Sequence, residues 1–147
     1  MASLSDAELL RQTMLFFDIE QRRLLVQHGP LTQSRMLLIL LRHGALSQVE
    51  LGRKLSLEKS WVSRAIDKLV EHGWVERTQS QKDRRAFNLT LTAAGDARAR
   101  MLRTEIDRHA SHVLERLAPD EQALVMQAIR LLDAVIERPE TTPATHG

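Results

Sequence analysis

The chain changes its hydrophobic period once, and this change limits most strongly how it can fold. Over most of its 147 residues, apolar side chains recur every three to four positions, as on one face of a helix. Residues 87–91 instead alternate apolar and polar side chains with a period of two, which is typical of a half-buried strand, and we interpret residues 74–78, which lead from apolar to polar side chains, as its partner strand. These two segments predict a β-hairpin within a helical chain. Because a two-stranded hairpin is marginally stable alone, we expect it to pack on the helices.

Capping signals delimit the helices before the hairpin. Ser5 with Glu8 forms a capping-box pattern that opens a long first helix, which Gly29 and Pro30 end. We expect Thr32 to cap a second helix running to residues 43–44. A second capping box, Ser47 with Glu50, opens a short helix that ends near residue 55, and a further helix follows over residues 59–72.

Two more helices are expected after the hairpin. Thr92 starts a long one, and Pro119 lies in the first turn of the last one, where its missing N–H costs nothing. The apolar face of the last helix is wider than one core contact requires, which indicates a second buried surface such as a dimer interface.

Residues 48–66 have the spacing of two short helices joined by a tight turn. Gly52 is small where the second helix must cross closely, and that helix buries Val62, Ile66 and Leu69. Its exposed face carries hydroxyl and basic side chains that suit the DNA major groove, where Arg pairs with guanine and Ser contacts phosphate. The candidate DNA-binding residues here are Lys59, Ser60, Trp61, Ser63, Arg64 and Lys68. Taken alone, this spacing also fits any small helical hairpin.

A hairpin directly after a helix-turn-helix predicts a winged helix. The tip of this hairpin carries Lys82, Asp83, Arg84 and Arg85, which complete the candidate DNA-binding set. An Arg at such a tip suits a narrow A·T-rich minor groove, where the negative potential is enhanced. Asp83 would repel DNA directly, so we expect it to pair with Arg85 and fix its direction. The alternative is a solvated charged turn.

The charge distribution indicates an anionic partner for the middle of the chain. Residues 53–103 hold 12 Lys and Arg against 6 Asp and Glu, whereas the remainder has a net charge of −4 and the whole chain +2. Chance clustering on a solvated surface gives the same count. Aromatic residues make up only 3% of the chain, which argues against a stacking platform for single-stranded nucleic acid.

The motifs LSQVEL (46–51), KSWVSRAIDKL (59–69), GWVER (73–77), DRR (83–85) and LTLTAAG (89–95) occur in the order that resembles the MarR (multiple antibiotic resistance regulator) family. The resemblance covers residues 31–95 at motif level, and the flanking helices match only in order and length. It implies a mostly α fold with a small β-hairpin wing (α+β), in which Ser60, Ser63 and Arg64 contact DNA and Asp83 and Arg85 form the wing-tip pair.

The resemblance also implies a domain plan and a function. The plan is an N-terminal dimerisation helix (1–30), a winged helix-turn-helix (31–92), C-terminal dimerisation helices (93–138) and a disordered tail (139–147). The implied function is a homodimeric regulator, a repressor of a palindromic double-stranded operator that a small aromatic or carboxylate ligand releases. The alternative from another class is a winged-helix protein-interaction module without DNA binding.

Three residues depart from the family pattern. Glu58 occupies the N-cap position of the second helix of the motif, where the family has Ser, Thr or Asp, and a longer carboxylate caps less well. Trp61 replaces a small Thr or Ser and packs either on thymine methyls or sugar, or against the wing as core. Trp74 replaces a Leu and is expected in the core.

Other candidate sites are weaker. Phe16, Phe17 and Met36 form a candidate effector pocket, although their spacing equally fits plain core. His109 and His112 lie three apart without further ligands at a telling spacing, so we expect no metal and no cofactor. Without Cys, and without a phosphate-binding glycine loop, nucleophile elbow or zinc-protease motif, we expect no enzyme.

The sequence also favours a cytoplasmic protein without membrane contact. The longest apolar run, residues 36–41, is far shorter than the about 20 residues that span a bilayer. The N-terminus lacks the basic and apolar regions of a signal peptide.

Overall fold

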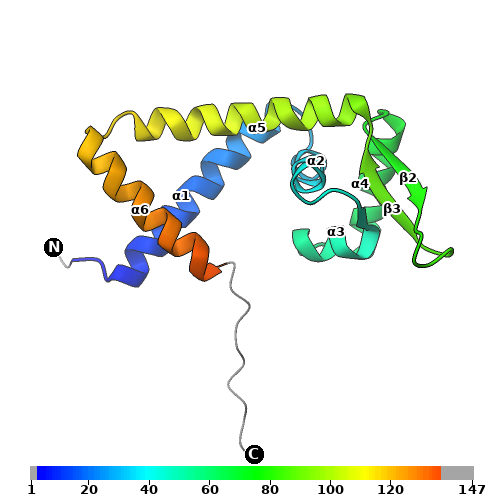
Figure 1. Cartoon of the computed structure of the whole chain (residues 1–147), viewed down its shortest axis with the longest axis horizontal. Helices are drawn as coiled ribbons and strands as arrows, with labels where there is room; N and C mark the ends of the chain where they lie inside the picture. Colours follow the sequence, from blue (N-terminus) through cyan, green and yellow to red (C-terminus); the bar gives the residue numbers. More distant parts are fainter. Residues whose placement is uncertain (1–2, 137–147) are drawn as a thin grey trace, which may run out of the picture. The chain divides into compact units, whose positions relative to one another are not determined.

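The computed structural model describes residues 3–136 and shows a mostly helical chain with one small antiparallel sheet, which confirms the predicted fold class (Figure 1). The chain divides into two compact units, residues 1–107 and 108–147. The predicted tail, residues 139–147, lies outside the described residues. The elements in chain order are α1 (Asp6–Val26), α2 (Leu31–His43), β1 (Leu46–Ser47), α3 (Gln48–Leu55), α4 (Lys59–Glu71), β2 (Val75–Gln79), β3 (Phe87–Leu91), α5 (Ala93–Leu114) and α6 (Pro119–Ile136).

Both predicted capping boxes are present at the starts of α1 and α3. The Glu8 amide donates to the Ser5 hydroxyl at 3.3 Å, and the Glu50 amide donates to the Ser47 hydroxyl at 3.2 Å. In each box the N-cap amide donates back to the glutamate carboxylate. These bonds satisfy N–H groups that the first helical turn leaves without a partner.

The prediction that Thr32 caps α2 is wrong. Pro30 is the N-cap, and its carbonyl accepts from the Ser34 amide at 3.1 Å. Because the ring of Pro30 holds its φ at −58°, the chain already enters the helix at Leu31. Thr32 therefore lies within the first turn.

The sheet contains a strand that the period analysis missed. β2 and β3 pair antiparallel from Val75 opposite Leu91 to Gln79 opposite Phe87, so the first strand starts one residue later than predicted. β1 pairs with the other edge of β3, which gives the order β1-β3-β2. Two residues are too short to show a period, yet β1 connects the start of α3 to the hairpin through backbone hydrogen bonds.

One hydrophobic core holds the winged-helix elements of the first unit together. It contains Val62, Ile66 and Leu69 of α4, as predicted, together with side chains from α1, α2, α3, the sheet and the first half of α5. The buried hydrophobic residues of this core outside α4 are Leu25, Met36, Leu37, Leu40, Leu46, Leu51, Val75, Leu89, Ala99 and Leu102. The burial of this face of α4 leaves the opposite face of the helix in solvent.

The start of α5 crosses the connection between α4 and β2 at van der Waals contact. The Thr92 hydroxyl donates to the Gly73 carbonyl at 2.6 Å and accepts from the Gly95 amide at 3.0 Å. A Cβ atom on Gly95 would lie 1.8 Å from the backbone oxygen of Trp74. Only glycine therefore allows the helix to approach this closely.

The second unit, as far as it is described, exposes much of its apolar surface. No residue of α6 is buried, and its exposed large apolar side chains are Leu124, Ile129, Leu131, Leu132, Val135 and Ile136. In α1, which belongs to the first unit, Leu25 alone is buried. None of the helices within residues 3–136 combines the length and the apolar character that a membrane span requires.

Gly95→Ala is expected to lower the free energy of unfolding by about 3 kcal/mol or more, because the new methyl group meets backbone that cannot move without shifting the hairpin. Chemical denaturation followed by circular dichroism measures the change. Ala94→Ser, at the exposed neighbouring position, is the control and should unfold like the parent. Equal stability of Gly95→Ala and the parent would contradict this account.

Candidate nucleic-acid interface

The turn between α3 and α4 is tight because a small residue lies where the helices meet. A Cβ on Gly52 would lie 3.1 Å from a methyl carbon of Val62, which confirms the predicted close crossing. The Leu57 amide donates to the Gly52 carbonyl at 3.1 Å. Ser56 closes the turn in the left-handed region with a φ of 52°. This turn fixes the position of α4 relative to α3.

The outer face of α4 presents the predicted residues to solvent. Lys59, Ser60, Trp61, Arg64 and Lys68 are exposed, and Ser63 is half-buried.

Glu58 occupies the N-cap of α4, as predicted, and its side chain makes no capping hydrogen bond. Because the first turn of α4 also contains no acidic residue, its N–H groups are left to solvent or to an anionic ligand.

The two tryptophans have different surroundings. Trp61 is 62% exposed, which excludes its packing as core, and the Arg64 guanidinium carbon lies 5.9 Å from the centre of its ring. Trp74 is half-buried against the core, as expected. His72 stacks on the Trp74 ring at 4.5 Å between ring centres, and the Arg98 guanidinium lies 5.0 Å from it.

An ion pair connects α4 to the wing. The Arg77 guanidinium on β2 donates to the carboxylate of Asp67 on α4. Both side chains are partly solvent-exposed, so the pair contributes little to overall stability. It joins two elements that the backbone connects only through the turn at residues 72–74, and it therefore orients β2 relative to α4.

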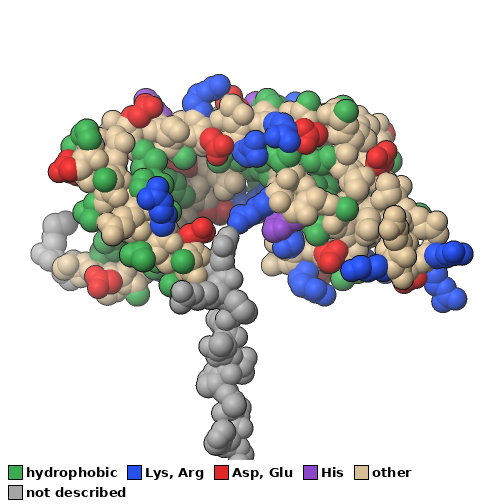
Figure 2. Space-filling view, viewed as in Figure 1, with side chains coloured by type: hydrophobic (Ala, Val, Ile, Leu, Met, Phe, Trp, Pro, Cys, Tyr) green, Lys and Arg blue, Asp and Glu red, His purple; other side chains and the backbone are tan. Residues whose placement is uncertain are grey.

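The wing tip is a closed loop with cationic side chains outside it. The Ser80 amide donates to the Ala86 carbonyl, and the Ala86 amide donates to the Asp83 carbonyl, each at 3.0 Å. Figure 2 shows Lys and Arg side chains gathered at the free end of the hairpin. These are Lys82, Arg84 and Arg85, all exposed.

Asp83 contacts Arg85 through the backbone. The Asp83 carboxylate accepts from the Arg85 amide at 2.9 Å, so it fixes the turn rather than the guanidinium. The Arg85 side chain extends from a backbone that this contact holds in place.

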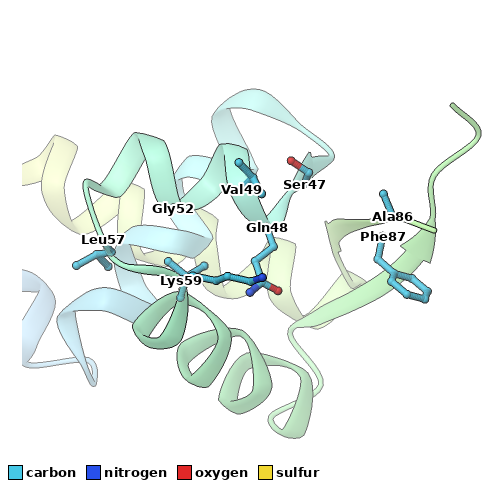
Figure 3. A pocket seen from close by; sticks show the side chains of 9 residues that line it. Ser47, Gln48, Val49, Gly52, Leu57, Lys59, Ala86 and Phe87 are labelled. Carbon is cyan, nitrogen blue, oxygen red and sulfur yellow. The ribbon is translucent and has the colours of Figure 1, made fainter. Parts of the chain in front are cut away.

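A cavity of about 390 Å³ separates the start of α4 from the wing. Its walls come from α3, the start of α4 and the start of β3, and they are largely apolar (Figure 3). In this view the side chains of Gln48 and Lys59 point toward one another across its opening. The cavity lies beside the start of α4 and shows that the wing is not packed tightly against the helix there.

The capping glutamate beside this cavity favours its ionised form. Hydrogen bonds from the Ser47 amide and the Ser47 side chain hold the pKa of Glu50 below its usual range, with smaller contributions from Arg53 and Lys54. A lowered folded pKa contributes stability above the unfolded value, and this contribution is lost as the pH falls through the folded value. The start of α3 is therefore weakened by acid.

The candidate effector residues are not brought together. Met36 is completely buried in the core, whereas Phe16 and Phe17 are 52% and 44% exposed on α1. The two phenylalanines pack edge to face with ring centres 5.6 Å apart. Among the described residues no cluster of three or more His, Asp or Glu side chains could hold a metal ion.

The sequence analysis missed several residues around the start of α4 and the wing. Gln48 and Val49 on α3 and Phe87 on β3 line the cavity, and Arg77 makes the contact from wing to helix. The i,i+3 spacing of Trp61 and Arg64 is a signal that pattern analysis can use. The pairing of Asp67 with Arg77 depends on the path of the chain between them and leaves no local signal.

Arg77→Gln is expected to accelerate amide hydrogen exchange in β2 by up to about fivefold while changing the melting temperature little, since the ion pair that it removes is exposed. Lys68→Gln is the control, because it removes an exposed pair with Glu71 that lies within α4 alone. Unchanged exchange in β2 of Arg77→Gln would show that the pair does not hold the wing.

Comparison with known proteins supports this architecture. Residues 25–87 match the model of the MarR family. The uncharacterized HTH-type transcriptional regulator YfiV of Bacillus subtilis is 28% identical over 105 residues, which are 71% of this chain and 66% of YfiV. The HTH-type transcriptional regulator PrsX of Escherichia coli is 33% identical over 79 residues, 54% of this chain and 48% of PrsX. The alignments thus span about half to two thirds of these relatives.

Solved structures show the same fold over more of the chain. The apo form of wild-type MarR from E. coli superposes with a TM-score of 0.77 at 22% identity, covering 90% of this chain and 98% of MarR. MepR, a transcription regulator of the Staphylococcus aureus multidrug efflux pump MepA, superposes with a TM-score of 0.73 at 17% identity, covering 91% and 100%. Over residues 25–87, which hold the helix-turn-helix and the first strand of the wing, this chain is therefore similar to the MarR family, and its fold is that of these solved structures.

Proposed function

We propose that this protein is a transcriptional regulator that binds double-stranded DNA. One observation carries the proposal: the buried face of α4 fixes its opposite face outward, and that face and the wing tip both expose cationic side chains. In this arrangement α4 enters the major groove and the hairpin tip reaches the adjacent minor groove. The regulators named among the relatives support the proposal.

Each exposed residue has a role in this arrangement. Lys59, Ser60, Ser63 and the N-terminus of α4 bind phosphate, and Arg64 pairs with a base edge. The charge of the wing tip attracts the backbone of an A·T-rich minor groove, through Lys82, Arg84 and Arg85. Asp83 holds the loop from which Arg85 extends, which offsets the repulsion of its own charge.

We propose further that the protein is a homodimer. α1 and α6 each expose a series of large apolar side chains, more than a monomeric protein commonly leaves in water. A second copy covers them with a self-complementary surface, as two-fold symmetry requires. A two-fold dimer presents two α4 helices to half-sites about one helical turn apart, so the operator is palindromic.

Repression is the mode of regulation that we propose, supported by the relative MdtR of Bacillus subtilis, which is named a repressor. We propose that a small aromatic or carboxylate ligand releases the repressor from its operator. Such a ligand must bind two geometries of the dimer with different affinities. A ligand that binds without changing operator affinity is not an effector of this kind.

A second function is favoured by one observation. Trp61 is 62% exposed, and exposed tryptophans are frequent at the centres of protein–protein interfaces. A winged-helix protein-interaction module without DNA binding would use this residue. A mobility-shift assay with the DNA upstream of its own gene, repeated across a salt series, separates the two functions. For a DNA-binding protein, the logarithm of the binding constant falls against the logarithm of the salt concentration with a slope of about −0.9 for each neutralised phosphate. No shift at low salt would exclude the first function.

Arg85→Ala is expected to weaken operator binding about tenfold and to reduce the salt slope by about one for each phosphate that the arginine neutralises. The backbone contact between Asp83 and residue 85 does not need the side chain, so the wing keeps its shape. Arg116→Ala, which removes an exposed cation from the second unit, is the matched control and should bind like the parent. Dissociation of the dimer in Arg85→Ala, measured by sedimentation, would show that its role is structural.

Leu132→Glu is expected to shift the protein from dimer to monomer, because a carboxylate on the apolar face of α6 would be buried without a partner. Sedimentation equilibrium at micromolar concentration should give twice the 16.8 kDa chain mass for the parent and the chain mass for the variant. Val49→Glu, at an apolar residue of α3 that is 65% exposed, should remain dimeric. A monomeric parent would refute the dimer.

A further inference from the structure

We propose that Trp61 determines operator sequence: its indole packs on the 5-methyl group of a thymine, and its ring face orients the Arg64 guanidinium toward the neighbouring base. This inference rests on the proposed DNA binding and names the residue pair that supplies part of its specificity.

The position of Trp61 suits base contact. It is the third residue of α4, and helices in the major groove contact base edges with their N-terminal residues. Its side chain is 62% exposed, so it contributes little to the core. Packing against a base edge would remove the apolar surface of the indole from water, which the fold of the free protein does not do.

The contact with Arg64 gives Trp61 a second effect. The guanidinium carbon lies 5.9 Å from the ring centre, within the range of a cation–π interaction, and the two residues are three apart on one helix face. A guanidinium must be correctly oriented to donate two hydrogen bonds to guanine. Because the indole restricts the rotamers of Arg64 before binding, less side-chain freedom is lost in the complex.

The charges around Trp61 favour DNA over a protein partner. Lys59 precedes it and Arg64 follows it on the same helix, and both are exposed. The two acidic residues further along α4 are paired, Asp67 with Arg77 and Glu71 with Lys68. Glu58 at the N-cap opposes this positive character. Trp61, Arg64 and Lys68 also line a shallow cavity of about 210 Å³ against the start of α2.

The experiment removes the methyl group from the DNA rather than from the protein. An operator is first selected from random duplexes with the parent protein. Each thymine of one half-site is then replaced in turn by deoxyuridine, which lacks only the 5-methyl group, and affinities are measured for the parent, Trp61→Phe and Trp61→Ala. We expect one position at which deoxyuridine weakens the parent about fourfold, the factor that burying one methyl group supplies. Trp61→Ala should be indifferent there, and Trp61→Phe should keep most of the effect.

Two further readouts test the arginine and the contact itself. The double variant with both Trp61→Ala and Arg64→Ala should lose about two- to fivefold less affinity than the product of the two single losses. This difference measures the coupling between the two residues. DNA should also protect the parent's tryptophan fluorescence from acrylamide. This protection should vanish in Trp61→Phe, in which the half-buried Trp74 is the remaining tryptophan.

The outcomes separate this inference from the function on which it rests. A parent protein that binds no duplex at low salt overturns DNA binding itself. If the parent selects an operator, but at no thymine of that operator does the effect of removing the methyl group require Trp61, the inference alone is overturned. Unchanged DNA affinity and selectivity in Trp61→Ala likewise overturns it.

Discussion

The burial of Val62, Ile66 and Leu69 orients α4, and the candidate interface depends on this one packing contact. These side chains occupy one stripe of the helix, so the core cannot accept them without turning the polar stripe outward. Gly52 permits the approach of α3 and α4 that the packing requires, since a Cβ there would lie 3.1 Å from Val62. The residues proposed to contact DNA are thus positioned by side chains that never reach the nucleic acid.

The wing is held by contacts from three directions. β1 pairs with β3 and joins the hairpin to the start of α3, and Arg77 pairs with Asp67 of α4. The start of α5 fits against the Trp74 carbonyl at Gly95, where any larger side chain collides. The apolar cavity between α3, α4 and β3 remains open. The wing is therefore fixed at its base, whereas the region between the start of β3, α3 and the start of α4 is loosely packed.

Much of the fold is predictable from local patterns. The two capping boxes, the end of α4 near residue 72 and the start of α6 at Pro119 depend on bonds and steric limits within a few residues, and the structure has each as predicted. Thr32 misled the prediction because a suitable capping side chain does not decide where a helix begins when proline already fixes the backbone. β1 was missed because a two-residue strand exists only through its partner.

For the candidate site, the sequence by itself determined which residues form the buried stripe of α4 and which cationic residues of α4 and the wing tip face solvent, since helical periodicity divides buried from exposed positions. Only the tertiary structure decided how these side chains are held. It placed Trp61 in solvent beside Arg64, directed Asp83 to a backbone amide, and separated Met36 from Phe16 and Phe17. Such contacts depend on rotamers and on the packing of distant segments. Periodicity assigns a residue to a face of its element, but it carries no information about what lies opposite that face.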